Sequence, residues 1–86
     1  MANHASAKKR IRQTLKRTQR NKNIRTRVRT YVKRVRAAID AEDKSAAEEA
    51  LKTAVASIDG AVSKGVYHRK TGARYISRLT RQVRDL

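Results

Sequence analysis

The chain contains no proline, and its three glycines stand at positions 60, 65 and 72. Proline and glycine are the residues that most often interrupt a helix, so their scarcity favours long helices over a turn-rich sheet protein. No helix breaker occurs between Ala7 and Ala41, and this segment is therefore predicted to form one rod about 50 Å long, at roughly 1.5 Å per residue. An 86-residue chain is sufficient for one small domain with a modest core.

The second half of this segment, residues 24–39, carries an apolar stripe. Each residue advances by about 100° around a helix, and the apolar side chains then fall within one arc of about 100°. The stripe consists of Ile24, Val28, Tyr31, Val32, Val35 and Ile39. The basic residues of this half fall outside the arc, so we expect an amphipathic helix that packs on the rest of the protein.

The first half of the segment, residues 8–22, has no such stripe. Its cations surround almost the whole helix: Lys8, Lys9, Arg10, Arg12, Lys16, Arg17, Arg20 and Lys22. Ile11 and Leu15 form only a short patch, rotated away from the later stripe. No face could be buried without burying unpaired charge, which is very unfavourable. We therefore predict that residues 1–22 form a basic arm that projects beyond a bundle formed by residues 24–86.

Residues 43–64 are predicted to form a second helix, capped by Asp43 or Ser45. Its apolar stripe consists mostly of small residues: Ala47, Ala50, Leu51, Ala54, Val55, Ile58, Ala61 and Val62. Ser45 and Glu48 have the spacing of a capping box. Glu48 and Glu49 are expected in the first turn, where acidic side chains complement the helix dipole.

Gly65 is expected to end the second helix in the left-handed conformation, with Val66 folding back over the last turn. A third helix is predicted over residues 69–85, with His68 as its cap. Its core face is Ala73, Ile76, Leu79 and Val83, and its opposite, basic face is Lys70, Arg74, Arg78, Arg81 and Arg84. Short connections make neighbouring helices antiparallel. The predicted fold class is all-α, a three-helix bundle with a long, basic first helix that projects beyond the bundle.

The sequence contains no constellation of catalytic or metal-binding residues. It has no cysteine, only two histidines (His4 and His68) and no glycine-rich phosphate loop. Its clustered acids are interpreted as solvated side chains at a helix start: Asp40, Glu42, Asp43, Glu48 and Glu49. No apolar run approaches the roughly 20 residues of a membrane span, and no signal peptide is recognisable. We expect no enzyme activity, cofactor, metal, membrane partner or small-molecule substrate.

The net charge of +16 is unevenly distributed. Residues 1–39 carry 14 Lys/Arg and no acid, residues 40–60 carry two Lys and six acids, and residues 61–86 carry seven Lys/Arg and one acid. Such like charges repel one another unless a polyanion neutralises them. A membrane-surface helix needs a continuous apolar face, which residues 8–22 lack. Nucleic acid is therefore the expected partner.

RNA is favoured over DNA, although the residues alone leave the choice open. Modules that stack RNA bases use exposed aromatic side chains. Tyr31 falls in the core arc and is expected to pack, whereas Tyr67 and Tyr75 could either pack or stack on a base or sugar. No zipper or helix-turn-helix pattern supports reading of duplex DNA. Binding to phosphates and backbone shape is expected. The alternatives are a non-specific DNA-compacting protein and a basic module that captures an acidic protein.

Four stretches together resemble the S-twenty family of bacterial small-subunit ribosomal proteins. They are MANHASAKKRIRQ (1–13), RNKNIRTRVRTYVKRV (20–35), AEDKSAAEEA (41–50) and SKGVYHRKTGARYISRL (63–79). The likeness keeps the same order and spacing nearly from end to end. It implies a three-helix bundle at the base of the small subunit that binds 16S ribosomal RNA directly, early in assembly, with the long first helix lodged among RNA helices. It also implies few or no protein partners and a ribosome-bound location, in the cytoplasm or in an organelle matrix.

The resemblance places RNA contacts on Ala7 to Arg10, on Arg20 to Lys22, on Arg25, Arg29 and Thr30, and on the turn from His68 to Arg74 with Ser77 and Arg78. With neighbouring cations, the predicted RNA-binding residues are Lys8, Lys9, Arg10, Arg12, Lys16, Arg17, Arg20, Asn21, Lys22, Arg25, Arg27, Arg29, Thr30, His68, Arg69, Lys70, Arg74, Ser77, Arg78 and Arg81. After the histidine the family usually shows lysine-asparagine-lysine-alanine-alanine-arginine. This chain has Arg69-Lys70-Thr71-Gly72-Ala73-Arg74 there, which keeps the charge, loses the asparagine and adds Gly72. Residues 1–86 are thus expected to form a single helical domain that binds ribosomal RNA.

Overall fold

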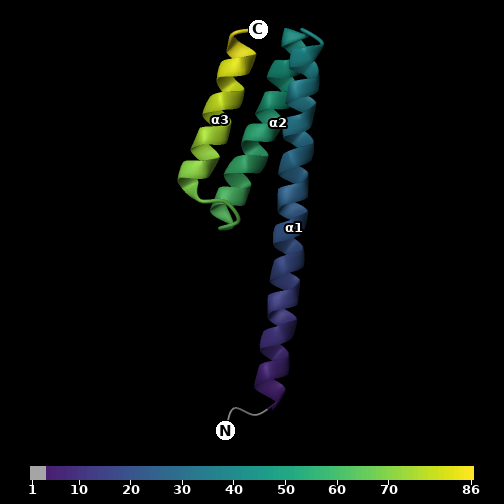
Figure 1. Ribbon diagram of the computed structural model, residues 1–86, viewed down its shortest axis with the longest axis vertical. Helices are drawn as coiled ribbons and strands as arrows, with labels where there is room; N and C mark the ends of the chain where they lie inside the picture. Colours follow the sequence, from purple (N-terminus) through teal and green to yellow (C-terminus); the bar gives the residue numbers. More distant parts are fainter. Residues whose placement is uncertain (1–3) are drawn as a thin grey trace.

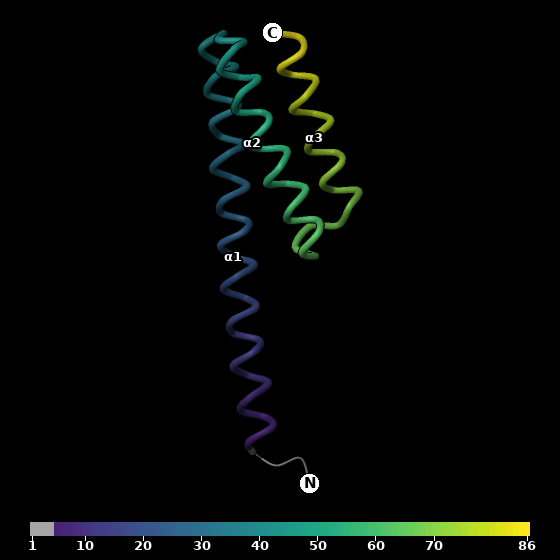
Figure 2. The backbone as a smooth tube through the Cα atoms, turned by 180° about the vertical axis from the view of Figure 1, so that it is seen from behind, coloured from purple at the N-terminus to yellow at the C-terminus, as the bar shows by residue number. Residues whose placement is uncertain are grey.

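The computed structural model describes residues 4–86 and is built from three α-helices (Figure 1). Helix α1 spans His4–Asp40, α2 spans Lys44–Ser63 and α3 spans Arg69–Arg84. Helix α2 runs back beside the C-terminal half of α1, and α3 runs back beside α2 (Figure 2). The N-terminal half of α1 extends alone beyond both, which gives the molecule a length of 62 Å. The predicted three-helix bundle with a long projecting first helix is confirmed.

The core lies where α2 packs on α1, with α3 covering the other side of α2. Its buried apolar residues are Ile24, Val28, Val35, Ala47, Ala54, Ile58, Ala61, Val66, Leu79 and Val83. Val35 and Ile58 are the largest side chains with no exposed surface. Tyr31, Val32 and Ile39 of the predicted stripe are partly buried against this core. The amphipathic pattern of residues 24–39 therefore identified the face of α1 that packs.

Small side chains on α2 let it approach α1 closely. Ala47, Ala54 and Ala61 recur every seven residues on one side of α2, and none is more than 1% exposed. The distance between packed helices depends on the side chains at their contact, so a row of methyl groups permits close packing. Helix α2 contacts both of its neighbours, whereas α1 and α3 barely touch. The bundle is therefore open between α1 and α3.

The chain reverses between α1 and α2 at Glu42, whose φ is +54°. The Glu42 N–H donates to the Ile39 carbonyl at 2.9 Å, and the Asp43 N–H donates to the Ala38 carbonyl at 3.1 Å. These are the two hydrogen bonds of a Schellman motif, whose left-handed position is usually glycine. Within residues 4–86, Glu42 is the only residue other than glycine with a positive φ. The left-handed conformation is unfavourable for a side chain with a Cβ atom, by about 1–2 kcal/mol.

The same motif ends α2 with the residue that sequence analysis predicted. Gly65 has a φ of +77°. Its N–H donates to the Val62 carbonyl at 3.0 Å, and the Val66 N–H donates to the Ala61 carbonyl at 2.9 Å. Val66 folds back and is buried in the core. Both predictions, the left-handed Gly65 and the returning Val66, are confirmed.

Asp43, rather than Ser45, caps α2. Its carboxylate accepts a hydrogen bond from the Ala46 N–H at 3.1 Å. Ser45 therefore lies inside the helix, and the predicted capping box between Ser45 and Glu48 is not formed. The first turn of α2 contains no acidic residue, so the placement of Glu48 and Glu49 there was wrong by one turn. Because Asp43 is the cap, α2 begins at Lys44, two residues earlier than it would with Ser45 as the cap. Glu48 and Glu49 therefore fall in the second turn.

The core face of α3 differs from the prediction at one position. Ala73 is exposed, and Gly72 is buried in its place. A Cβ atom built on Gly72 would lie 2.5 Å from Val62 Cγ2 and 3.4 Å from Ile58 Cγ2. The glycine therefore allows α3 to approach α2 closely.

Candidate nucleic-acid interface

The N-terminal half of α1 is a free helical arm, defined here as residues 5–22 (Figure 1). All of these residues are exposed except Asn21, which is half-buried. The predicted arm began at residue 1, and residues 1–3 lie outside the described part of the chain. The first buried residue is Ile24. The eight predicted cations of the arm are all exposed: Lys8, Lys9, Arg10, Arg12, Lys16, Arg17, Arg20 and Lys22.

Two side-chain hydrogen bonds of the arm join residues one helical turn apart. Thr14 Oγ1 donates to the Arg10 carbonyl at 2.9 Å, and Gln19 Nε2 donates to Asn23 Oδ1 at 3.0 Å. Ile11 and Leu15, one turn apart, remain 60% and 64% exposed. The predicted short apolar patch thus has no partner in the bundle. The arm is a rod with cations on every side, and Ile11 and Leu15 form an exposed apolar pair on one of its sides.

No acidic side chain neutralises the cations of the arm. Across residues 4–86 the only ion pair joins Arg84 Nε to Asp85 Oδ1 at 3.4 Å, at the far end of the bundle. The acids of α2 face solvent, including Glu48 and Glu49. Like charges arranged in this way raise the positive potential around the arm and attract polyanions.

A junction cluster of four cations lies where the arm leaves the bundle. Lys16, Arg20 and Arg27 of α1 line a shallow hollow together with Lys64, which follows α2. Sequence analysis did not include Lys64 among the RNA-binding residues. Its position at the end of α2 could be predicted, but which part of α1 faces that end depends on how the two helices pack.

The turn before α3 lies at the same end of the bundle, beside the base of the arm (Figure 1). His68 caps α3 as predicted, because its Nδ1 accepts a hydrogen bond from the Lys70 N–H at 3.1 Å. The neutral ring then carries its proton on Nε2, which can donate outward. Arg69 and Lys70 are exposed in the first turn of α3, where the helix dipole also favours anions. The arm, the junction cluster and this turn thus lie at the same end of the bundle and are together called the basic corner.

The remaining predicted residues of α3 continue from this corner along the helix. Arg74, Ser77, Arg78 and Arg81 are all exposed. Arg74, Arg78 and Arg81 are spaced by four and three residues and Ser77 adjoins Arg78, so all four occupy one face of α3. Two predicted residues of α1 are partly engaged: Thr30 Oγ1 donates to the Thr26 carbonyl at 3.0 Å, and Asn21 Oδ1 accepts from the Arg20 guanidinium at 3.4 Å.

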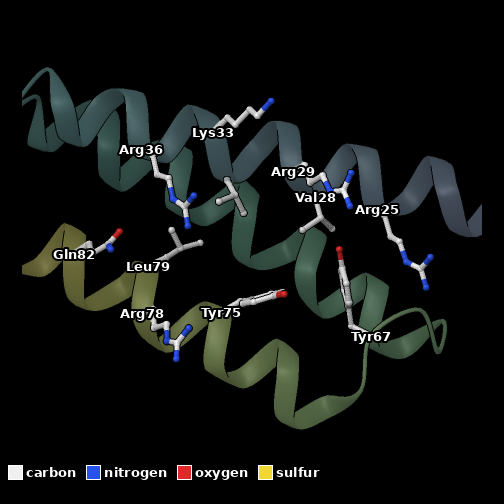
Figure 3. A pocket seen from close by; sticks show the side chains of 11 residues that line it. Arg25, Val28, Arg29, Lys33, Arg36, Tyr67, Tyr75, Arg78, Leu79 and Gln82 are labelled. Atoms are coloured by element: carbon white, nitrogen blue, oxygen red, sulfur yellow. The ribbon is translucent and has the colours of Figure 1, made fainter.

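A groove runs along the open side of the bundle between α1 and α3 (Figure 3). Arg25 and Arg29, both predicted, stand on its α1 wall, and Arg78 stands on its α3 wall. The structure adds Lys33 and Arg36, which continue the row of Arg25 and Arg29 at spacings of four and three residues. It also adds Tyr67, Tyr75 and Gln82. Lys33 and Arg36 could have been predicted from the sequence, because they continue the helical spacing of Arg25 and Arg29.

None of the helices within residues 4–86 combines the length and apolar character needed to cross a membrane. The same part of the chain contains no cluster of three or more histidine, cysteine or acidic residues placed to hold a metal ion.

The chain is similar to known sequences along almost its whole length. The sequence model of the family described as Ribosomal protein S20 matches residues 2–84. The small ribosomal subunit protein bS20 of Geotalea daltonii is 55% identical over 86 residues, which cover all of this chain and 99% of the relative. The bS20 proteins of Syntrophus aciditrophicus and Campylobacter concisus are 55% and 52% identical, covering 96% and 100% of this chain and 93% and 97% of the relatives.

Proposed function

The chain belongs to the ribosomal protein S20 family, and from this premise we propose that it binds 16S ribosomal RNA directly and stabilises the folded RNA during assembly. Family membership makes it a structural ribosomal protein rather than an enzyme, associated with the small subunit and its RNA. In a bacterium such a protein is ribosome-bound in the cytoplasm. The basic corner is the feature that supports direct binding to 16S RNA and a role in assembly.

The observation that supports direct binding most strongly is the exposure of the arm on every side. Eight cations surround a single helix that has no acidic neighbour. A helix charged on one face can bind one RNA surface, whereas a rod charged all round can lie between several. Bringing phosphate backbones together against their own repulsion requires such a rod, because each cation lowers the local charge density of the RNA.

We propose that the bundle fixes the position and direction from which the arm leaves it. Lys16 and Arg20 of the arm meet Lys64 at the junction cluster, and Arg69 and Lys70 extend the same surface. Arginine guanidinium groups donate up to five hydrogen bonds in a plane and can grip a phosphate with two of them. The corner therefore favours an RNA surface that is bent or branched over a straight duplex.

Protein partners are proposed to be few. Within residues 4–86 the large apolar side chains that remain exposed are Ile11, Leu15 and Tyr75. Ile11 and Leu15 lie on the arm, and Tyr75 lies in the groove on the opposite part of the molecule. Stable protein interfaces usually have a contiguous apolar core, and three scattered side chains do not make one.

A competition experiment separates this proposal from its main alternative, non-specific DNA compaction. The protein bound to a labelled fragment of 16S RNA is challenged with unlabelled duplex DNA at about 0.2 M salt, where non-specific binding is weak. We expect the DNA to displace the RNA only at large excess. Equal competition by RNA and DNA would support the compaction function. Sedimentation of the protein with small ribosomal subunits in cell extracts provides a second, independent measurement.

A further inference from the structure

The α1–α3 groove has the size of a small-molecule site. Its volume is about 540 Å³, within the range of roughly 300–1,000 Å³ that is typical of ligand pockets. It exists because α2 packs on both neighbours while α1 and α3 barely touch. Val28, Val32 and Leu79 form its apolar floor. The groove is thus a hollow with an apolar base, unlike the convex surface of the arm.

The walls of the groove are basic and contain no acidic residue. Arg25, Arg29 and Arg36 rise from α1, and Arg78 rises from α3. Figure 3 shows Arg36 pointing across the groove toward Leu79. None of these guanidinium groups pairs with a carboxylate in the described part of the chain, where the only ion pair involves Arg84. An anionic group that enters the groove therefore meets donors with no competing partner.

Two tyrosines occupy one end of the groove. The rings of Tyr67 and Tyr75 meet edge to face, with centroids 5.9 Å apart and planes at 84°. Tyr75 is 40% exposed and extends from α3 into the groove (Figure 3). A partly exposed ring held by a second ring is a fixed surface on which a base can stack, since every base has a π face.

We propose that this groove is a second RNA subsite that accepts one unpaired nucleotide, with its base on Tyr75 and its phosphate at Arg36, the arginine that points toward Leu79. This inference rests on the proposed function. The basic corner would bind phosphates of folded RNA, and the groove would bind a base. Bases inside a duplex are stacked on their neighbours and cannot reach Tyr75, so the nucleotide must come from a bulge, loop or junction.

The groove fits a nucleotide better than it fits a protein helix. An acidic amphipathic helix would also match basic walls and an apolar floor. However, Val28 and Leu79 are only 3% and 4% exposed, so a docked helix could bury little further apolar surface there. Tyr75 is exposed, whereas Tyr67 is half-buried, so Tyr75 is the better placed of the two for stacking. A flat base with one phosphate uses both the ring and the arginines.

The test compares two RNA hairpins that differ by a single bulged 2-aminopurine. Each hairpin is closed by a non-nucleotide linker, so that the bulge supplies the only unpaired base. The full chain is titrated into each, and affinity is measured by anisotropy while stacking is measured by quenching of 2-aminopurine fluorescence. We expect the bulged hairpin to bind roughly five- to tenfold more tightly, in the lower part of the range for one stacked base. Tyr75→Leu should remove both the preference and the quenching, and Tyr75→Phe should keep them.

Tyr31→Leu serves as the matched control, because Tyr31 lies outside the groove and its ring is instead contacted by Arg34 at 5.4 Å. This variant should keep the preference for the bulge. Circular dichroism of each variant checks that helix content is unchanged.

Equal affinity of the natural chain for both hairpins, or a preference that survives Tyr75→Leu, overturns the subsite. The subsite is also overturned if the chain shows no preference for the bulged hairpin and binds an acidic amphipathic peptide in a Tyr75-dependent manner. That result would assign the groove to a protein partner. A chain that prefers 16S RNA over duplex DNA but ignores the bulge refutes the subsite alone. Loss of RNA preference in both experiments refutes the proposed function as well.

Discussion

Gly72 of α3 lies so close to Val62 of α2 that a Cβ atom on the glycine would stand 2.5 Å from Val62 Cγ2. Val62 is β-branched, and its helical χ1 angle is strongly restricted, so it cannot easily turn away. The contact fixes how closely α3 packs on α2 and therefore the position of every basic residue on α3.

Gly72→Ala should therefore destabilise the protein by about 1 kcal/mol. The overlap is unfavourable by roughly 1–3 kcal/mol, and the higher helix propensity of alanine offsets about 1 kcal/mol of it. In a Val62→Ala background the overlap disappears, and the same substitution should stabilise by about 1 kcal/mol. Urea unfolding of the four proteins measures this cycle. Additive effects would show that the two positions do not constrain each other.

The two helix-ending motifs provide a second prediction with an internal control. Glu42→Gly should raise the free energy of unfolding by about 0.5–1 kcal/mol, because glycine adopts the left-handed conformation without the Cβ penalty. Gly65→Ala should lower it by about 1 kcal/mol for the same reason. Thermal melting by circular dichroism measures both. A stabilising effect of Gly65→Ala would be incompatible with a φ of +77° at that position.

Burial along α2 predicts a graded response to truncation. Ile58 has no exposed surface, so Ile58→Ala should destabilise by about 2–5 kcal/mol and Ile58→Val by about 0.5–1.5 kcal/mol. Leu51, which sequence analysis placed in the core, is only partly buried. Leu51→Ala should therefore have a smaller effect than Ile58→Ala. Denaturant midpoints rank the three variants, and the reverse order would place the core on the other side of α2.

Deleting residues 1–22 should separate RNA affinity from stability. The deletion removes eight cations, whereas the first buried residue is Ile24. We expect cooperative melting of the bundle to persist while affinity for 16S RNA falls steeply. Circular dichroism and filter binding measure the two effects. If melting lost its cooperativity, the arm would have to contribute to folding, which the exposure of residues 5–20 argues against.

Charge removal at single positions tests the map of the interface. Lys9→Gln, Arg20→Gln and Arg74→Gln should each weaken RNA binding and reduce the slope of log affinity against log salt by just under about one unit. Lys52→Gln makes the same change of charge on the exposed outer side of α2 and should leave the slope nearly unchanged. Glu48→Gln should also have little effect. A slope that responds to Lys52 but not to Arg20 would move the interface onto α2.

Much of the candidate site could be predicted from sequence because it depends on local structure. A charge that surrounds a helix cannot be buried, so the cations of residues 8–22 had to project whatever the rest of the chain did. Asp43 was one of two predicted caps, and His68 and Gly65 were identified outright, because caps depend on neighbours two or three residues away. Glu48 and Glu49 were wrongly placed in the first turn, because that placement fits a helix capped by Ser45 and the cap is Asp43.

The sequence by itself thus determined the three helices, the His68 cap, the glycine that ends α2 and the exposed basic arm. Tertiary packing alone decided that Gly72 rather than Ala73 faces α2, that Lys64 joins Arg20, and that Tyr75 and Arg36 share a groove. Helical periodicity defines a face only to within one residue, so adjacent small residues are equally good candidates for the core. Contacts between helices depend on how closely side chains interdigitate, and that distance is set by atoms far apart in the chain.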